Sequence, residues 1–213
     1  MAQESLQIEG RTTTLSRVGW LTLVLLAMVI GIVSLRYALP HVPFPAGLPN
    51  LRSRHAWLIG HAVFSSIALL SGVWQFSSSL RRSRIGVHRW LGRVYCVAVL
   101  MGWLTSIPIA MHANFGAIPS AGFLALGVAW IVSTACGYFT VRRGEIALHR
   151  EWMMRSYALT AAAITLRLYL PVFPLMGMSF ATSYRIIAWL CWIPNLLVVE
   201  WMIRRQRRNA AAR

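Results

Sequence analysis

The stretch VGWLTLVLLAMVIGIVSL, residues 18–35, carries no charged side chain over its whole length. As a helix it would rise about 27 Å, close to the roughly 30 Å thickness of a bilayer's hydrocarbon core. A bilayer offers no water to backbone N–H and C=O groups, so such a stretch crosses it as a helix. No convincing small-residue cleavage site follows it, and we therefore expect an uncleaved span rather than a signal peptide.

Five more apolar segments follow this one. The chain is 57% hydrophobic and 12% charged, whereas soluble domains have about 25% charged residues. We therefore expect an all-α, polytopic membrane helix bundle with six transmembrane helices and both termini on the inner side. The predicted spans are Val18–Leu35, His55–Phe76, His88–Pro108, Ser120–Val141, Glu151–Met176 and Ser183–Ile203. They leave an N-terminal tail (1–17), an outer loop (36–54) and a basic tail (204–213) around a five-helix core (55–203).

Arginines set the orientation. All 21 basic residues are arginine, and the net charge is +16. No soluble segment is left to carry a nucleic-acid-binding module, so we attribute this charge to topology. Sixteen arginines fall on one side of the six spans and only Arg36, Arg52, Arg54 and Arg185 on the other. The positive-inside rule then places both termini in the cytoplasm of a bacterium, with the arginines against anionic lipids of the inner membrane.

Several kinds of chemistry are disfavoured. The three cysteines lie in apolar segments and form no Cys-x-x-Cys pair, so neither a disulfide framework nor a thiolate metal site is indicated. Nothing resembles a nucleophile triad, a phosphate loop or a pair of catalytic carboxylates, which disfavours hydrolysis.

Two similar stretches stand at the inner ends of two spans: HRWLGRVY at 88–95 and HREWMMRSY at 149–157. One interpretation is anchoring, with the arginines holding the topology and Tyr95 and Tyr157 at headgroup depth. The histidines favour a second interpretation, because each lies on a face of small and polar residues, where membrane helices meet. The faces are His61, Ser65, Ala68, Gly72 and Gln75; His88, Gly92, Tyr95, Val99, Gly102 and Ser106; and His149, Met153, Ser156, Thr160, Ala163 and Arg167.

Two candidate sites follow from these faces. His88 and His149 are predicted axial ligands of one haem b iron, with Arg89 and Arg150 on the propionates and Gly92 leaving room for the porphyrin. Arg167 lies 18 residues beyond His149 and is level with His61. It has no obvious acidic partner, and an arginine at this depth is costly. We therefore expect it to bind an anion near His61 and Gln75.

The segment from about Arg54 to Pro171 resembles an uncharacterised family of predicted bacterial integral membrane proteins, classed as a domain of unknown function. The resemblance rests on HAVFSSIALLSGVWQF (61–76), LRRSRIGVHRWLGRVY (80–95) and ALHREWMMRSYALTAAAITLRLYLP (147–171). It implies a multi-span membrane protein without a settled activity. The architecture is also similar to transmembrane di-haem cytochromes b. Those hold two histidine pairs, whereas the fourth span here contains no histidine, so at most one haem is expected.

Three functions remain open. The first is a membrane cytochrome that carries electrons to a quinone or a redox partner. The second is a transporter of small molecules or anions, for which broken helices would be evidence. The third is a non-catalytic accessory subunit whose polar faces serve only packing.

Overall fold

The structure is a computed structural model that describes the backbone of residues 2–39 and 48–212, and the side chains of 17–39 and 48–212. Helices account for nearly all of this part of the chain, and no strand occurs in it. In chain order the elements are α1 (Ala2–Ser34), η1 (Leu35–Ala38), α2 (Pro49–Arg52), α3 (His55–Val73), η2 (Trp74–Phe76), α4 (Ser78–Ser83), α5 (Ile85–Met111), α6 (Ala117–Arg142), α7 (Ile146–Thr160), α8 (Ala162–Leu175), α9 (Phe180–Leu190) and α10 (Ile193–Ala211).

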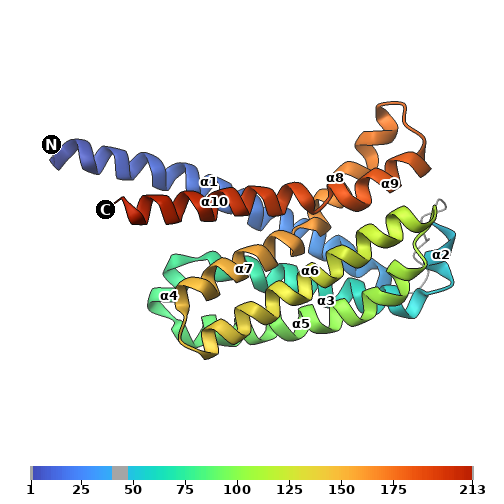
Figure 1. Cartoon of the computed structure of the whole chain (residues 1–213), viewed down its shortest axis with the longest axis horizontal. Coiled ribbons are helices and arrows are strands. Elements are labelled where there is room, and N and C mark those ends of the chain that lie inside the picture. The colour runs from blue at the N-terminus through green and yellow to red at the C-terminus, as the bar shows by residue number, and fades with distance from the viewer. Residues whose placement is uncertain (1, 40–47, 213) are drawn as a thin grey trace.

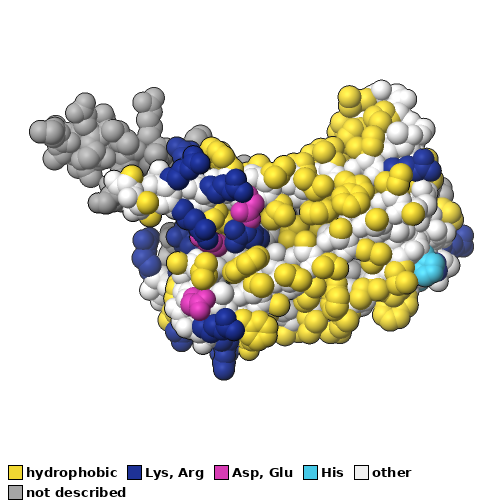
Figure 2. Space-filling model, viewed as in Figure 1, with side chains coloured by type: hydrophobic (Ala, Val, Ile, Leu, Met, Phe, Trp, Pro, Cys, Tyr) yellow, Lys and Arg dark blue, Asp and Glu magenta, His cyan; other side chains and the backbone are white. Residues whose placement is uncertain are grey.

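Six stretches of helix are long and apolar enough to cross a membrane, which confirms the predicted helix bundle and its number of spans. They are Arg17–Ala38, His55–Phe76, Ile85–Met111, Ala117–Arg142, Ile146–Leu175 and Phe180–Ala211. The space-filling view agrees, because a broad apolar band separates the basic groups gathered toward one end from the few at the other (Figure 2). We call these the arginine-rich end and the opposite end.

Four helices form the centre of the bundle. Neighbouring pairs α3–α5, α5–α6, α6–α7 and α7–α3 are all in contact, so the four close into a ring. Around this ring α1 packs on α3, α9 on α6 and α10 on α7. Both chain termini and α4 lie toward the arginine-rich end, whereas α2 lies at the opposite end and α8 and α9 lean away from the ring there (Figure 1).

The middle of the ring contains a hydroxyl network. The Tyr95 hydroxyl lies 2.7 Å from Ser156 Oγ and 2.8 Å from Thr160 Oγ1. Thr134 Oγ1 is 2.6 Å from Ser156 Oγ, and Trp130 Nε1 donates to Thr160 Oγ1 at 2.8 Å. Each member therefore has a partner within the chain, as a polar group in an apolar interior requires.

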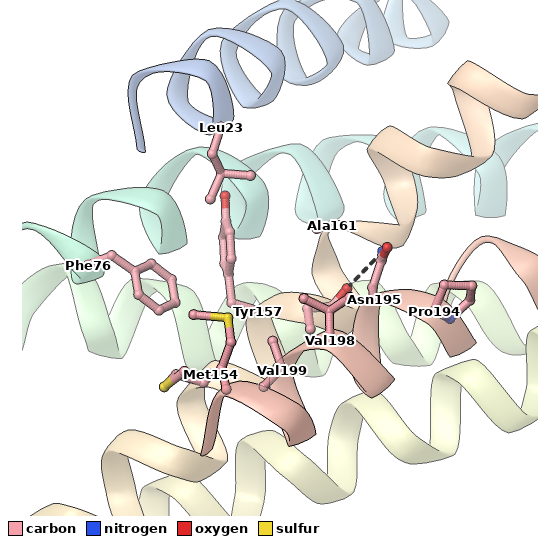
Figure 3. Close-up of a pocket in the computed structure, with 11 residues that line it drawn as sticks. Leu23, Phe76, Met154, Tyr157, Ala161, Pro194, Asn195, Val198 and Val199 are labelled. Atoms are coloured by element: carbon pink, nitrogen blue, oxygen red, sulfur yellow. Dashed lines mark hydrogen bonds between the residues drawn. The ribbon is translucent and has the colours of Figure 1, made fainter. Parts of the chain in front are cut away.

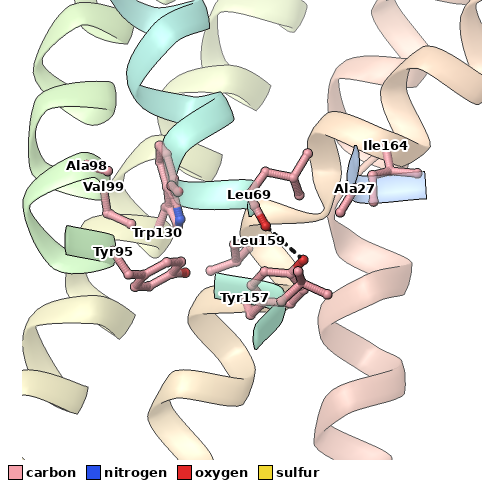
Figure 4. Packing of buried hydrophobic residues seen from close by; sticks show 11 residues of the cluster. Ala27, Leu69, Tyr95, Ala98, Val99, Trp130, Tyr157, Leu159 and Ile164 are labelled. Atoms are coloured by element: carbon pink, nitrogen blue, oxygen red, sulfur yellow. Dashed lines mark hydrogen bonds between the residues drawn. The ribbon is translucent and has the colours of Figure 1, made fainter. Parts of the chain in front are cut away.

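The two tyrosines of the repeated motifs do not lie where the anchoring interpretation predicted. Tyr95 and Tyr157 are only 1% and 4% exposed and lie in the core, not at headgroup depth (Figure 4). The reason is that α5 and α7 begin at Ile85 and Ile146, so both tyrosines lie about 15 Å along their helices. Tyr157 donates to the Leu69 carbonyl at 3.2 Å, which ties α7 to α3.

Gly72 makes this packing of tyrosines possible. A Cβ atom at this position of α3 would lie 2.7 Å from ring atoms of both Tyr95 and Tyr157. Real Cβ atoms do not approach carbon atoms so closely, and both neighbours are rigid aromatic rings. Glycine is therefore needed here for close approach, which is the usual role of small residues between membrane helices.

The fifth and sixth spans were predicted as single helices, and each is interrupted. The fifth breaks at Ala161, and the sixth at Cys191 and Trp192. Pro194 explains the second break, because proline cannot donate the backbone hydrogen bond that a continuous helix requires. Nothing in the local sequence explains the first break. Pro108, Pro171 and Pro174, by contrast, lie inside helices.

One side chain joins the two breaks. Asn195 Nδ2 lies 3.3 Å from the Ala158 carbonyl, 3.2 Å from Thr165 Oγ1 and 3.1 Å from the Cys191 carbonyl. Thr165 Oγ1 also donates to the Cys191 carbonyl. Carbonyls near the interruptions are thus satisfied by the chain itself, which is how non-helical backbone is tolerated at membrane depth.

The ends of the helices differ from the predicted segments. The helix α1 begins at Ala2 and α10 continues to Ala211, so helix extends into both predicted tails. Hydropathy marks the part of a helix that lipid accepts, and arginine and glutamine are good helix formers beyond it. Of the predicted outer loop 36–54, residues 40–47 lie outside the described residues.

Glu200 forms an ion pair with Arg155. Arg155 Nη2 donates to Glu200 Oε2 at 3.1 Å, and a second contact joins Arg155 Nε to Glu200 Oε1. Arg207 Nε donates to Glu151 Oε1 at 2.7 Å. These ion pairs hold the end of α10 against α7 at the arginine-rich end.

Candidate functional site

The two histidines of the repeated motifs lie at the same end of the ring. Each is the fourth residue of its helix, His88 in α5 and His149 in α7. They lie within range of electrostatic interaction with each other. At this end of the ring, η2 and α4 connect α3 to α5, and a short turn connects α6 to α7. The fold thus brings His88 and His149 to the same end of the ring, and their role as a ligand pair stays a prediction.

The tautomer of His149 is fixed by the backbone. Its Nδ1 lies 2.7 Å from the Gly137 carbonyl of α6, and since a carbonyl only accepts, Nδ1 carries the proton. A proton on Nδ1 leaves Nε2 as the nitrogen that can bind a metal. Histidines that bind metals commonly donate their other nitrogen to a backbone carbonyl in this way, which orients the ring.

His88 is half-buried and differs from His149 in lacking a partner. Its Nδ1 is buried and makes no hydrogen bond among the residues that the structure describes. The same holds for Nε2 of Gln75, at the end of the span that begins with His55. An unsatisfied polar group in an apolar interior costs about 1–3 kcal/mol. Two such groups in one place indicate a region that receives a ligand or water.

Gln75 occupies the space that was predicted for a porphyrin. Its Oε1 would lie 3.6 Å from a Cβ atom at Gly92, which is one helical turn from His88 on the same face. The Gln75 amide therefore covers Gly92. It was predicted to lie near Arg167, and that prediction was wrong. The sequence placed Gln75 with His61 because both lie on one face of α3, but 14 residues of helix separate them by about 21 Å.

Arg81 completes the site and was predicted only as a topology signal. Its Nη1 donates to the Gln75 carbonyl at 2.7 Å, and it lies within electrostatic range of His88. Partial burial, followed by the guanidinium groups of Arg150 and Arg82, lowers the pKa of Arg81 below its usual value. An anion would relieve this repulsion. The stretch LRRSRIGVHRW gave no signal that Arg81, rather than its neighbours, turns inward.

We call Gln75, Arg81, His88, His149 and Arg150 the histidine–arginine site. Arg150 is exposed and within electrostatic range of Arg81. Arg89 is also exposed, and it lies within the same range of His88. Within the described part of the chain, no group of three or more His, Cys, Asp or Glu side chains could hold a metal ion. Haem iron needs only two axial side chains, so the donor set fits a haem, provided that Gln75 moves off Gly92.

The second predicted site lies toward the opposite end. Arg167 is half-buried in α8 and donates from Nη1 to the Ala163 carbonyl at 2.8 Å. It lies within electrostatic range of His61, as predicted, and also of Arg36 and Tyr37. His61 Nδ1 donates to the Gly102 carbonyl at 2.9 Å.

An apolar groove of about 390 Å³ lies beside the two helix breaks (Figure 3). Its surface comes from α1, α7 and α10, together with Phe76, and is almost entirely apolar. Asn195 and Tyr157 are its polar members, and both already donate within the chain. The groove therefore offers complementarity to hydrocarbon and is separate from the histidine–arginine site. It is lined by Leu23, Phe76, Met154, Tyr157, Ala158, Ala161, Pro194, Asn195, Val198, Val199 and Met202.

Comparison with known proteins supports the family that the motifs suggested. Residues 58–203 match the family described as "Predicted membrane protein (DUF2306)". The matched region includes both members of the histidine pair and all helices from α3 into α10. No curated protein and no solved structure matched, so the likeness to cytochromes b stays a prediction. Because the match covers more than half of the chain, this multi-span membrane protein belongs to that family, whose function is unknown.

Proposed function

We propose that the chain binds one haem b at the histidine–arginine site and takes part in electron transfer within the membrane. The observation that carries this proposal is that His88 and His149 lie within electrostatic range of each other at one end of the ring. Nδ1 of His88 is buried without a partner among the described residues, and Nδ1 of His149 is bonded to a backbone carbonyl, which leaves its Nε2 for a ligand. Bound between them, a haem would supply one-electron chemistry.

The chain's own groups would hold this ligand in two ways. His88 and His149 would hold the iron through ring nitrogens, with the Gly137 carbonyl fixing the orientation of the second ring. Arg81 and Arg150 would pair with the propionates, and Arg89 is a further candidate for the same role. Gln75 would rotate away from Gly92. Because its Nε2 has no hydrogen-bond partner among the described residues, this movement breaks no hydrogen bond of that nitrogen.

The absorption spectrum of the full-length protein, purified in detergent after expression with ample haem, tests this proposal. We expect a Soret band that sharpens and shifts on reduction. His88→Ala and His149→Ala should each abolish it, because iron held from both sides needs both imidazoles. The matched control is His112→Ala, at the exposed far end of α5, which should keep the band. Wild-type protein that stays colourless after reconstitution with haem would refute the proposal.

The orientation and the partners complete the proposal. The arginine-rich end would face the cytoplasm of a bacterial inner membrane, where it meets anionic lipids, and electrons would pass to a quinone or a membrane redox partner. A reporter enzyme that works only in the cytoplasm should then be active when it is fused after Arg213, and one that works only in the periplasm should be inactive there. Activity of a periplasmic reporter at that position would reverse the orientation.

Transport is the second candidate, and the two interrupted spans favour it. Transporter sites often lie where two discontinuous helices meet at membrane depth. Here the breaks at Ala161 and Trp192 are joined through Asn195. The chain itself thus satisfies backbone groups at the breaks without a transported small molecule or anion, so the haem proposal has the stronger support. An accessory role is what remains if neither ligand nor transport is found.

A further inference from the structure

Arg167 stands apart from the histidine–arginine site and is not used by the proposed electron transfer. It lies in α8, eight residues before that helix ends at Leu175, which is about 12 Å along the helix axis. Leu175 and Met176 are 86% and 71% exposed, as expected of residues at the lipid or headgroup boundary. The Arg167 guanidinium bends back to the Ala163 carbonyl, so it would reach a headgroup of the opposite end by releasing that contact.

Where the structure describes side chains, no acidic residue pairs with Arg167. The sequence has five acidic residues. Glu145, Glu151 and Glu200 are at the arginine-rich end, and Glu4 and Glu9 precede the first span. Among the described residues, the ion pairs involve only Arg155 and Arg207 with Glu151 and Glu200. The counter-charge of Arg167 must come from outside the chain or from solvent.

One positive charge and one phenol group lie near Arg167, those of Arg36 and Tyr37. Arg36 of η1, at the far end of the first span, lies within electrostatic range. His61 lies within the same range and has its Nδ1 committed to Gly102. The guanidinium itself has five N–H donors, and its only hydrogen bond among the described residues is the one to Ala163. Most of its donors are thus left for a ligand.

We propose that Arg167 binds a phosphate-type oxyanion at the opposite end of the membrane. The planar guanidinium matches two oxygens of such a group in a bidentate arrangement, which a chloride ion cannot use. The phosphate group of a lipid headgroup and free inorganic phosphate share this chemistry. Arg36, close to the same rim, strengthens the attraction for either source.

The test uses the full-length protein in a neutral detergent and two probes, short-chain phosphatidylglycerol and inorganic phosphate. Affinity is measured by calorimetric titration, and phospholipid retained from the membrane is counted by native mass spectrometry. Arg167→Gln removes the positive charge and the paired N–H donors of the guanidinium. The matched control is Arg185→Gln, another arginine of the opposite end, which is exposed and donates to the Phe115 carbonyl. Arg167→Lys keeps the positive charge but cannot form the bidentate contact.

We expect wild-type protein to bind at least one probe. Loss of one charge-assisted pair should weaken that binding by about tenfold or more in Arg167→Gln, and Arg185→Gln should stay within about twofold, as for a peripheral charge. Phospholipid binding alone identifies a headgroup site, and phosphate binding identifies a site for the free oxyanion. If Arg167→Gln does not fold, Arg167→Lys should still show a smaller loss. Failure of both probes with the wild type, or unchanged affinity in the folded variants, would overturn the proposal.

Discussion

The hydroxyl network in the middle of the ring and the histidine–arginine site at its end share helices α5 and α7, yet their polar groups differ in whether they find partners. In the network, Tyr95, Ser156, Thr160, Thr134 and Trp130 all find partners in one another. In the site, buried nitrogens of Gln75 and His88 have none among the described residues. Seven residues of α5, about 10 Å, separate Tyr95 from His88.

The difference separates packing from binding. A polar cluster that satisfies itself needs nothing else and can be explained by helix association alone. A cluster that leaves buried donors and acceptors unpaired is explained only if something else completes it. We therefore attribute the network to stability, and for the histidine–arginine site we propose ligand binding.

The largest expected effect is on the network. Tyr95→Ala removes a buried ring and its hydrogen bonds, and should lower the free energy of unfolding by about 3–5 kcal/mol. Tyr95→Phe removes only the hydroxyl and should cost about 0.6–1.7 kcal/mol, the range for hydrogen bonds between membrane helices. Unfolding in a titration with denaturing detergent measures both. If Tyr95→Ala unfolds like the wild type, the network has no stabilising role and the contrast fails.

An intermediate effect is expected at Gly72, which has to stay small for both tyrosine rings. Gly72→Ala should destabilise the protein by about 1–3 kcal/mol through overpacking. Gly86→Ala is the control, because a Cβ atom there meets nothing within 4 Å in another helix, and it should be neutral or stabilise by up to about 1 kcal/mol. Equal stability of the two variants, followed by thermal unfolding, would show that the rings can move aside.

The smallest change in stability is expected at the histidine–arginine site. Gln75→Leu removes a buried amide nitrogen that has no partner, so the ligand-free protein should be unchanged or stabilised by up to about 1 kcal/mol. The same detergent titration measures it. A loss above about 2 kcal/mol would mean that the amide is satisfied within the fold, and the distinction between the two polar clusters would disappear.

Residues of the candidate site could be predicted only in part from the sequence. His88 and His149 were paired because each opens an apolar segment beside an arginine, and helical periodicity fixes which face they share. Arg167 and His61 were matched in depth by counting residues along their helices. Gln75 and Arg81 were assigned differently, because their positions depend on how the chain turns through η2 and α4, and no periodicity governs a turn.

The sequence by itself determined the six spans and the side of each helix that meets its neighbours. These follow from the transfer of side chains to lipid and from the 3.6-residue period, both of which act locally. Only the tertiary structure decided that Tyr95 and Tyr157 lie in the core against Gly72, that the fifth span breaks at Ala161, and that Gln75 covers Gly92. Each of these depends on which atoms of another helix stand opposite, and that is set by packing across the whole ring.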